Sequence, residues 1–74
     1  MNTIENNGWL LTDNFGQEIE VNEKRQDFEG NIVTITGGMA PHKEGATGRV
    51  YITDEYGVEC VHYAGVYGLR WIKS

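Results

Sequence analysis

With 74 residues, of which 39% are hydrophobic and 23% charged, the chain is expected to fold as one small globular domain with a barely sufficient core. Its net charge of −5 arises from residues 1–30, which carry seven acidic and two basic side chains. Proteins that hold phosphate backbones normally offer a basic surface, so this balance disfavours avid, non-specific nucleic-acid binding.

The first part of the chain is predicted to form an acidic hairpin and a lead-in segment. Residues 1–8 are polar and end in an Asn-Asn-Gly breaker, so we expect them to fray. Segments 9–12 and 17–21 flank turn-forming residues, which favours their pairing. For residues 23–28 a short helix competes with a loop that delivers Phe28 to the core, and we favour the loop. The acidic side chains are expected to solvate the surface, with imitation of nucleic-acid phosphates or docking on a basic protein surface as the alternatives.

The central stretch predicts a strand, a glycine-rich loop and a second strand. Residues 31–36 and 49–53 are rich in Ile, Val, Thr and Tyr, which suit a pleated strand better than a helix. Alternation in the second run predicts one buried face. Residues 37–48 contain four glycines and Pro41, so we expect a loop whose shape these residues fix.

The last third of the chain predicts a hairpin and a final strand. Residues 54–57 have the composition of a four-residue hairpin connection. Residues 58–63 continue as a strand whose alternation does not decide which face is buried. Residues 64–68 then interrupt the pairing, and residues 69–72 are expected to form the last short strand.

A strand that opens after Gly30, a glycine-bearing loop and the step Gly48-Arg49-Val50 together resemble the KOW motif of bacterial transcription elongation factors and some large-subunit ribosomal proteins. The resemblance implies an all-β fold, a small SH3-like barrel of about five short strands with an N-terminal β-hairpin. In such barrels a single 3₁₀ turn commonly precedes the last strand. The KOW-like core would span residues 30–74, after the acidic hairpin and lead-in at residues 9–29.

Three strings of the chain are similar to those of short proteins carried by tailed bacteriophages: Asp27-Phe28-Glu29-Gly30, Ala40-Pro41-His42-Lys43 and Thr47-Gly48-Arg49-Val50. The resemblance implies a phage-encoded accessory protein that acts in the cytoplasm of the infected bacterial host. A cytoplasmic location is also expected because the single cysteine, Cys60, excludes an intramolecular disulfide. No run of residues has the apolar length of a signal peptide or a membrane span.

Two groups of residues are candidate contact points. One is the tip of the 37–48 loop, which offers Lys43 to a phosphate or the Met39-Ala40-Pro41 segment to a protein groove. The other is a surface of aromatic and arginine side chains, a combination that anchors protein interfaces and stacks on single-stranded bases. Its candidates are Tyr51, Tyr56, Tyr63, Tyr67, Trp71, Arg49 and Arg70, with Trp71 favoured as a core residue. The predicted binding site comprises Met39, Pro41, His42, Lys43, Arg49, Tyr51, Tyr67 and Arg70.

No combination of residues predicts catalysis, a metal site or a cofactor. Structural zinc normally needs four Cys or His ligands, and the chain contains only Cys60, His42 and His62. Cys60 and His62 are two residues apart on one strand, roughly 6–7 Å along the chain, which is too far for direct activation of the thiol. Cys60 is therefore expected to be a small buried residue. No phosphate-binding loop, nucleophile elbow or paired-carboxylate motif is present.

These observations predict a non-enzymatic accessory binding module. It would contact a host protein, in the transcription or translation machinery, through the 37–48 loop and the aromatic and arginine face. The alternative is direct nucleic-acid binding by the side that carries Lys43, Arg49, Arg70 and Lys73. A structural component of the virion is a third interpretation. The sequence leaves the partner's identity and the oligomeric state open.

Overall fold

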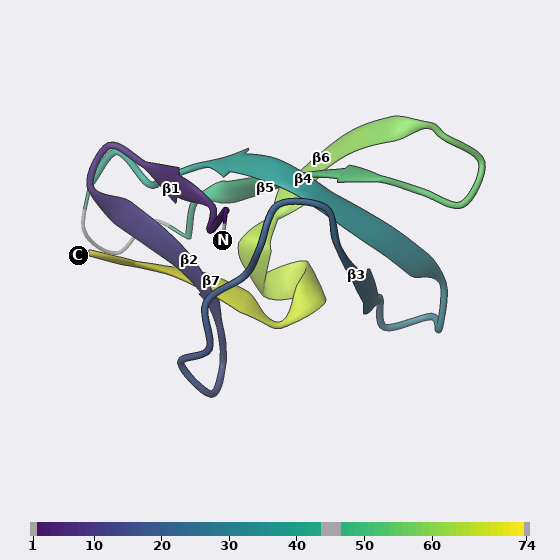
Figure 1. Ribbon diagram of the computed structural model, residues 1–74, viewed down its shortest axis with the longest axis horizontal. Coiled ribbons are helices and arrows are strands. Elements are labelled where there is room, and N and C mark those ends of the chain that lie inside the picture. The colour runs from purple at the N-terminus through teal and green to yellow at the C-terminus, as the bar shows by residue number, and fades with distance from the viewer. Residues whose placement is uncertain (1, 44–46, 74) are drawn as a thin grey trace.

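The computed structural model describes residues 2–43 and 47–73, and these residues form an all-β structure (Figure 1). One antiparallel sheet has the strand order β1-β2-β7 and the other has the order β3-β4-β5-β6. The elements are β1 (Glu5–Asn6), β2 (Trp9–Asp13), β3 (Glu23–Gln26), β4 (Ile32–Met39), β5 (Arg49–Thr53), β6 (Glu59–Tyr63), the 3₁₀ turn η1 (Ala64–Tyr67) and β7 (Leu69–Lys73). The predicted all-β class is confirmed as two small sheets, and the SH3-like barrel stays a prediction.

A single hydrophobic core joins the two sheets. On β5, Val50 and Ile52 are buried while their chain neighbours point outward, as the alternation predicted. Ile35 of β4 is paired with Ile52 and is fully buried. Burial of each such side chain contributes ~1.5–3 kcal/mol. Trp71 is only 7% exposed, which confirms it as a core residue. The core consists of Ile4, Leu11, Ile19, Val33, Ile35, Ala40, Val50, Ile52, Ala64, Tyr67, Leu69 and Trp71.

Strand β4 extends further than the sequence predicted. The expectation of a loop from residue 37 onward is wrong, because Gly37 and Gly38 continue β4 and pair with β5 after a register shift. Gly38 is needed in the strand because a Cβ there would lie 2.6 Å from Cζ2 of Trp71. A strand glycine therefore marks close approach of the indole ring and not a loop. Residues 44–46 of the predicted loop lie outside the described residues.

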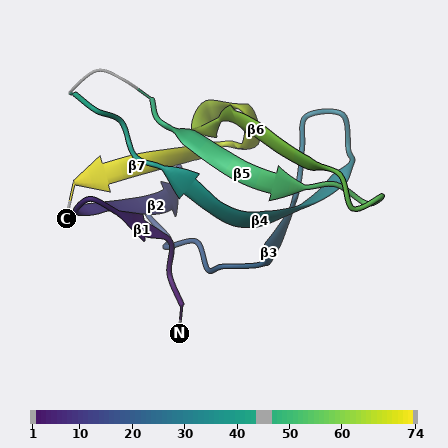
Figure 2. The same cartoon turned by 90° about the horizontal axis from the view of Figure 1, so that it is seen from above.

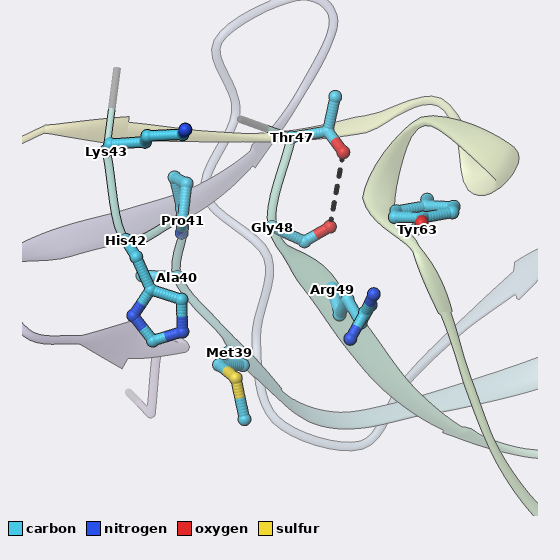
Figure 3. A pocket seen from close by; sticks show the side chains of 9 residues that line it. All are labelled: Met39, Ala40, Pro41, His42, Lys43, Thr47, Gly48, Arg49 and Tyr63. Atoms are coloured by element: carbon cyan, nitrogen blue, oxygen red, sulfur yellow. Dashed lines mark hydrogen bonds between the residues drawn. The ribbon is translucent and has the colours of Figure 1, made fainter. Parts of the chain in front are cut away.

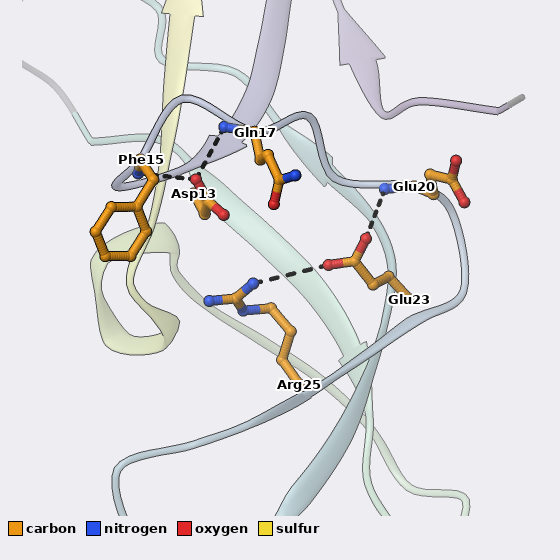
Figure 4. Close-up of polar contacts among 6 residues, drawn as sticks. All are labelled: Asp13, Phe15, Gln17, Glu20, Glu23 and Arg25. Atoms are coloured by element: carbon orange, nitrogen blue, oxygen red, sulfur yellow. Dashed lines mark hydrogen bonds and ion pairs between the residues drawn. The ribbon is translucent and has the colours of Figure 1, made fainter.

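Three hairpin turns share the sequence pattern Asp-x-x-Gly: residues 13–16, 27–30 and 54–57. In each turn the aspartate Oδ1 accepts hydrogen bonds from the amides two and four residues later, at 2.8–2.9 Å. The aspartate carbonyl accepts a further bond from the glycine amide. Each glycine has a φ of +82° to +88°, which favours glycine at that position. The turns predicted at residues 13–16 and 54–57 are confirmed, and Figure 4 shows the first of them.

The segment before β4 is an edge strand and neither a helix nor a loop. β3 pairs with β4, and the turn at residues 27–30 connects them. Phe28 lies in this turn and is 80% exposed, so the expectation that it enters the core is wrong. The approach to β3 is polar: the Glu23 carboxylate accepts the Glu20 amide at 3.3 Å and lies 3.7 Å from the Arg25 guanidinium (Figure 4).

The N-terminal segment is paired within the described residues, and the expected fraying is corrected there. Ile4 is 4% exposed and belongs to the core. Its amide donates to the Ile19 carbonyl at 3.1 Å, and its carbonyl accepts the Leu11 amide at 3.0 Å. The Ile19 amide in turn donates to the Leu11 carbonyl at 3.0 Å, which confirms pairing between segments 9–12 and 17–21 at this point. Residue 1 lies outside the described residues.

The C-terminal elements follow the predicted order. η1 ends at Gly68, whose φ is +70°, and β7 follows it directly. β7 pairs with β2, which joins the two ends of the sequence in one sheet. Figures 1 and 2 show the segments that flank the β4–β5 connection at one end of the long axis. The β3–β4 and β5–β6 turns lie at the opposite end. Among the described residues, no helix has the length and apolar composition needed to span a membrane.

Replacing Asp54 by alanine is expected to destabilise the protein by about 1–3 kcal/mol, because two turn amides lose their intramolecular acceptor, each hydrogen bond contributing ~0.5–1.5 kcal/mol. The amides belong to Tyr56 and Val58 and bond to Asp54 Oδ1 at 2.8 and 2.9 Å. Asp54→Asn keeps an oxygen in the same place and is the matched control. Urea unfolding measures the loss of stability in both variants. Equal losses for alanine and asparagine would contradict a role for Oδ1 in the turn.

Candidate binding site

A pocket of about 230 Å³ opens beside the segments that leave β4 and enter β5 (Figure 3). We call it the loop pocket. It combines residues 39–43, which are consecutive in sequence, with Arg49 and Tyr63, which the fold brings next to them. Its lining residues are Met39, Ala40, Pro41, His42, Lys43, Thr47, Gly48, Arg49 and Tyr63.

The loop pocket is fixed from behind by the core. The indole Nε1 of Trp71 donates to the Arg49 carbonyl at 3.2 Å. The ring also packs against Gly48, where a Cβ would lie 2.8 Å from that nitrogen. On the other arm, the Ala40 amide donates to Asn6 Oδ1 at 3.0 Å. Both arms are therefore attached to regular structure, although they flank a connection between strands.

Lys43 and Arg49 are the charged side chains of the described pocket lining, and both are basic. His42 and Lys43 are exposed on the arm that follows β4, whereas Pro41 is buried. The Arg49 guanidinium lies over the Tyr63 ring, 5.1 Å from its centroid, which is a cation–π contact. The described lining contains no acidic residue, in a chain whose net charge is −5. This arrangement is suited to a negative group beside an apolar surface.

The outward face of the β4-β5-β6 sheet continues from the loop pocket. Its two rows of cross-strand neighbours are Met39–Arg49–Tyr63 and Gly37–Tyr51–Val61. Val61 and Tyr63 are 56% and 57% exposed, which is high for large apolar side chains. We call Met39, Arg49, Tyr51, Val61 and Tyr63 the sheet face. Three of its members, Met39, Arg49 and Tyr63, also line the pocket, so the two surfaces form one continuous region.

Strand β6 now has defined faces, which the sequence left open. Val61 and Tyr63 point outward, while Cys60 is half-buried and packs against the core. Cys60 is thus less buried than expected. The His62 ring meets the Tyr67 ring edge to face, with centroids 5.8 Å apart. Within residues 2–43 and 47–73, no three His, Cys, Asp or Glu side chains are grouped so that they could hold a metal ion.

Two of the predicted site residues do not join this region. Tyr67 is 6% exposed and belongs to the core, because η1 turns its side chain inward before β7 begins. Arg70 is exposed on β7, but its neighbours Leu69 and Trp71 face the core. Its side chain therefore projects from the outer face of the β1-β2-β7 sheet. The aromatic and arginine surface is therefore smaller than predicted. The expected basic side is also divided, because Arg49 lies on the β3-β4-β5-β6 sheet whereas Arg70 and Lys73 lie on the β1-β2-β7 sheet.

Val61 is the sheet-face residue that the sequence analysis did not single out. The signal for it was present in the turn at residues 54–57. Tyr51 and Val61 each lie three residues from the hydrogen-bonded pair Asp54 and Val58 that closes this turn, so the antiparallel hairpin places them opposite each other. A predicted turn therefore also predicts which exposed side chains become neighbours.

Comparison with protein-family models, curated proteins and solved structures gives no match for this chain. The loop pocket and the sheet face are therefore interpreted from their own geometry and chemistry.

Proposed function

We propose that the protein is a non-enzymatic binding module that binds one segment of a partner protein with its loop pocket and sheet face. The continuity of these two surfaces carries the proposal. A segment that places one side chain in the pocket would contact Tyr63 and Arg49 as it leaves and then cross Tyr51 and Val61. Met, Tyr and Arg are the residue types enriched at the centres of protein interfaces.

The charge of the pocket favours a partner segment with an acidic side chain next to an apolar one. Lys43 and Arg49 approach the pocket from the two arms of the β4–β5 connection. The Arg49 guanidinium is already stacked on Tyr63, so less side-chain entropy is lost when it meets a carboxylate. The partner would therefore present a carboxylate between Lys43 and Arg49. It would also place an apolar group over Tyr51 and Tyr63.

The class of partner follows from the sequence resemblances alone. The central stretch resembles the KOW motif of transcription and translation factors, and the resemblance to phage proteins favours a partner in the bacterial host. We propose a host protein of the transcription or translation machinery as the partner. Such an accessory protein would act by occupying a surface and not by chemistry.

Lys43→Glu is expected to weaken partner binding at least tenfold, or about 1.4 kcal/mol, because it places a second negative charge at the acidic partner segment. Tagged wild-type protein first retrieves the partner from a bacterial lysate, and titration of the purified partner then gives the affinity. Lys24→Glu is the matched control. It makes the same charge change on β3, at a residue outside the loop pocket and the sheet face.

Equal weakening by the Lys43 and Lys24 variants would contradict the assignment, because it would report net charge and not a site. Tyr63→Ala provides a second measurement that leaves the charge unchanged. It removes an exposed ring, so the fold should tolerate it while partner affinity falls. Full affinity in both Lys43→Glu and Tyr63→Ala would move the binding site elsewhere.

One observation favours single-stranded nucleic acid as a second candidate ligand. Tyr51 and Tyr63 are exposed on one face beside Arg49, an arrangement on which bases can stack. This candidate requires binding of a single-stranded oligonucleotide whose affinity falls steeply with salt. Absence of binding at low salt would exclude it and leave the protein partner.

A further inference from the structure

A second cleft, of about 260 Å³, extends to Tyr67 from the turns at residues 27–30 and 54–57, which lie at the end of the molecule away from the β4–β5 connection (Figure 1). We call it the turn cleft, because the turns at residues 27–30 and 54–57 form its rim. The Ile32 amide donates to Glu55 Oε1 at 3.3 Å, which ties the β5–β6 turn to the start of β4. The cleft is acidic: Asp27, Asp54 and Glu55 line it, and no lysine or arginine is among the described residues of its lining.

The carboxylates of the turn cleft retain free acceptor capacity. Asp27 and Asp54 use Oδ1 within their own turns. Among the described residues, no donor bonds to Oδ2 of Asp54, and Oδ2 of Asp27 accepts only a 3.4 Å bond from the Asn31 amide group. The turns therefore hold the two carboxylates in fixed positions while one oxygen of each stays available.

The Tyr67 side chain is a second feature of the turn cleft. Tyr67 is 6% exposed and lines the turn cleft, and its ring is fixed edge to face against His62. Within residues 2–43 and 47–73, no group hydrogen-bonds its hydroxyl, and the hydroxyl oxygen is not one of the fully buried unpaired atoms, so it opens into the cleft. Burial, followed by the charges of Asp27 and Cys60, raises the pKa of Tyr67 above its usual 10.0. The hydroxyl is thus neutral near pH 7 and free to accept from a ligand.

We propose that the turn cleft binds an arginine side chain presented by a basic protein segment. A guanidinium offers five donors in a planar fork, and carboxylates and hydroxyls of the kind that line the turn cleft are acceptors for such donors. The carboxylates are too dispersed for a metal ion, since the described residues contain no group of three that could hold one. Tyr56 lines the same cleft and is 87% exposed, so it provides a ring on which a guanidinium can stack.

The turn cleft is independent of the proposed function, because its turns lie at the end of the molecule away from the β4–β5 connection and it has the opposite charge. With both sites occupied, the protein would join an acidic segment at one site to a basic segment at the other. A negative result at the turn cleft would leave the loop-pocket proposal unaffected.

The test is a nuclear magnetic resonance titration with a capped peptide of alternating glycine and arginine. The matched peptides carry citrulline, which has the shape of arginine without its charge, or lysine. We expect shifts confined to residues 27–32 and 54–56 and to Tyr67, no binding of the citrulline peptide, and weaker binding of the lysine peptide. Equal binding of the citrulline peptide, or shifts centred on the loop pocket, would overturn the proposal.

Two double variants separate the cleft from net charge. Asp27→Asn with Glu55→Gln removes two charges from the cleft and keeps the acceptor oxygens of the turn, and we expect at least fivefold weaker binding. Asp13→Asn with Glu18→Gln removes the same charges at and near the equivalent turn elsewhere, and we expect less than a twofold change. Equal weakening by both pairs would show non-specific attraction and would refute the site.

Tyr67→Phe removes only the hydroxyl, and we expect it to weaken the arginine peptide two- to fivefold while the unfolding midpoint is unchanged or raised. It keeps the test decisive if the double variant does not fold. Unchanged affinity in Tyr67→Phe would contradict the proposed contact. Sedimentation of the free protein provides the last check, because self-association that is reversed by the arginine peptide would show that a second copy occupies the cleft and would overturn the proposal.

Discussion

Replacing Gly48 by alanine is expected to lower the free energy of unfolding by about 3 kcal/mol, from left-handed backbone strain and overpacking together. Gly48 has a φ of +69°, a conformation that side chains with a Cβ rarely adopt. A Cβ there would also overlap the Trp71 ring and lie 2.9 Å from the Met39 carbonyl oxygen. Neither neighbour can move easily, because the ring is buried and the carbonyl belongs to the backbone of β4.

Gly65→Ala is the control for this change. A Cβ at Gly65 would meet no atom within 4 Å, and its φ is not in the left-handed region. The substitution should therefore be neutral or stabilising by about 0.4–1 kcal/mol, because it restricts the unfolded chain. Urea unfolding of the two variants compares the same chemical change at two glycines. A loss below about 1 kcal/mol for Gly48→Ala would show that Trp71 adapts, contrary to the overpacking argument.

Trp71→Phe separates the two causes of the Gly48 effect. The smaller ring loses the hydrogen bond to the Arg49 carbonyl and lacks the indole nitrogen that would lie 2.8 Å from a Cβ at residue 48, while the 2.9 Å approach to the Met39 carbonyl remains. The double variant should therefore be more stable than the sum of the two single losses predicts, since the residues are in contact. Additive losses would assign the whole Gly48 effect to backbone strain.

The position of Trp71 couples the proposed binding site to the stability of the fold. Its ring packs against Gly38 and Gly48 and accounts for the hydrogen bond that fixes the Arg49 backbone. The pocket is thus preorganised by a core residue, which reduces the entropy lost when a partner binds. Substitutions at exposed Lys43 or Tyr63 can test binding without this complication, whereas substitutions at the glycines cannot.

Local turn chemistry was the part of the fold best predicted from sequence. The pattern Asp-x-x-Gly at residues 13–16 and 54–57 indicated turns, and both are present. The same pattern at residues 27–30 was overlooked, because Phe28 suggested a core residue. Each turn displays one aromatic side chain outward, so hydrophobicity was misleading where the aspartate and glycine positions were not. The repeated pattern alone would have predicted the β3–β4 hairpin.

Contacts between segments far apart in sequence account for the remaining errors. The glycines of β4 resemble a loop until the buried ring of Trp71 is placed against them, and no local pattern announces that approach. Ile4 lies in a polar segment and is buried only because both Leu11 and Ile19 bond to its backbone. In each case tertiary packing overrides a reasonable local preference.

For the candidate site as well, the prediction succeeded where local sequence determines the position of a residue and failed where tertiary packing does. Met39, Pro41, His42 and Lys43 were predicted together because they are consecutive or nearly so, and their shared place in the fold follows from the chain. Tyr67 and Arg70 were assigned to the same surface by residue type alone. Their positions depend on how η1 turns the chain from one sheet to the other, which composition does not specify.

Ile35→Ala is expected to lower the free energy of unfolding by ~2–5 kcal/mol, because it leaves a cavity at the centre of the core. Ile35 is fully buried and is paired with Ile52 at the point where β4 changes register. Neighbouring strands cannot close the space without breaking that pairing. A domain of this size has a total stability of roughly 4–11 kcal/mol, so this loss removes a large part of it and should lower the midpoint of urea unfolding strongly.

Ile32→Ala makes the same change in the same strand and isolates the effect of burial. Ile32 is 39% exposed, and its amide keeps the bond to Glu55 whatever its side chain. We expect a loss of less than about 1.5 kcal/mol, since only part of the side chain leaves water on folding. The midpoints of urea unfolding of the two variants test whether the loss depends on burial. Similar losses would mean that the core is not centred on the β4–β5 pair, and the sheet face on the other side of these strands would lose its rigid support.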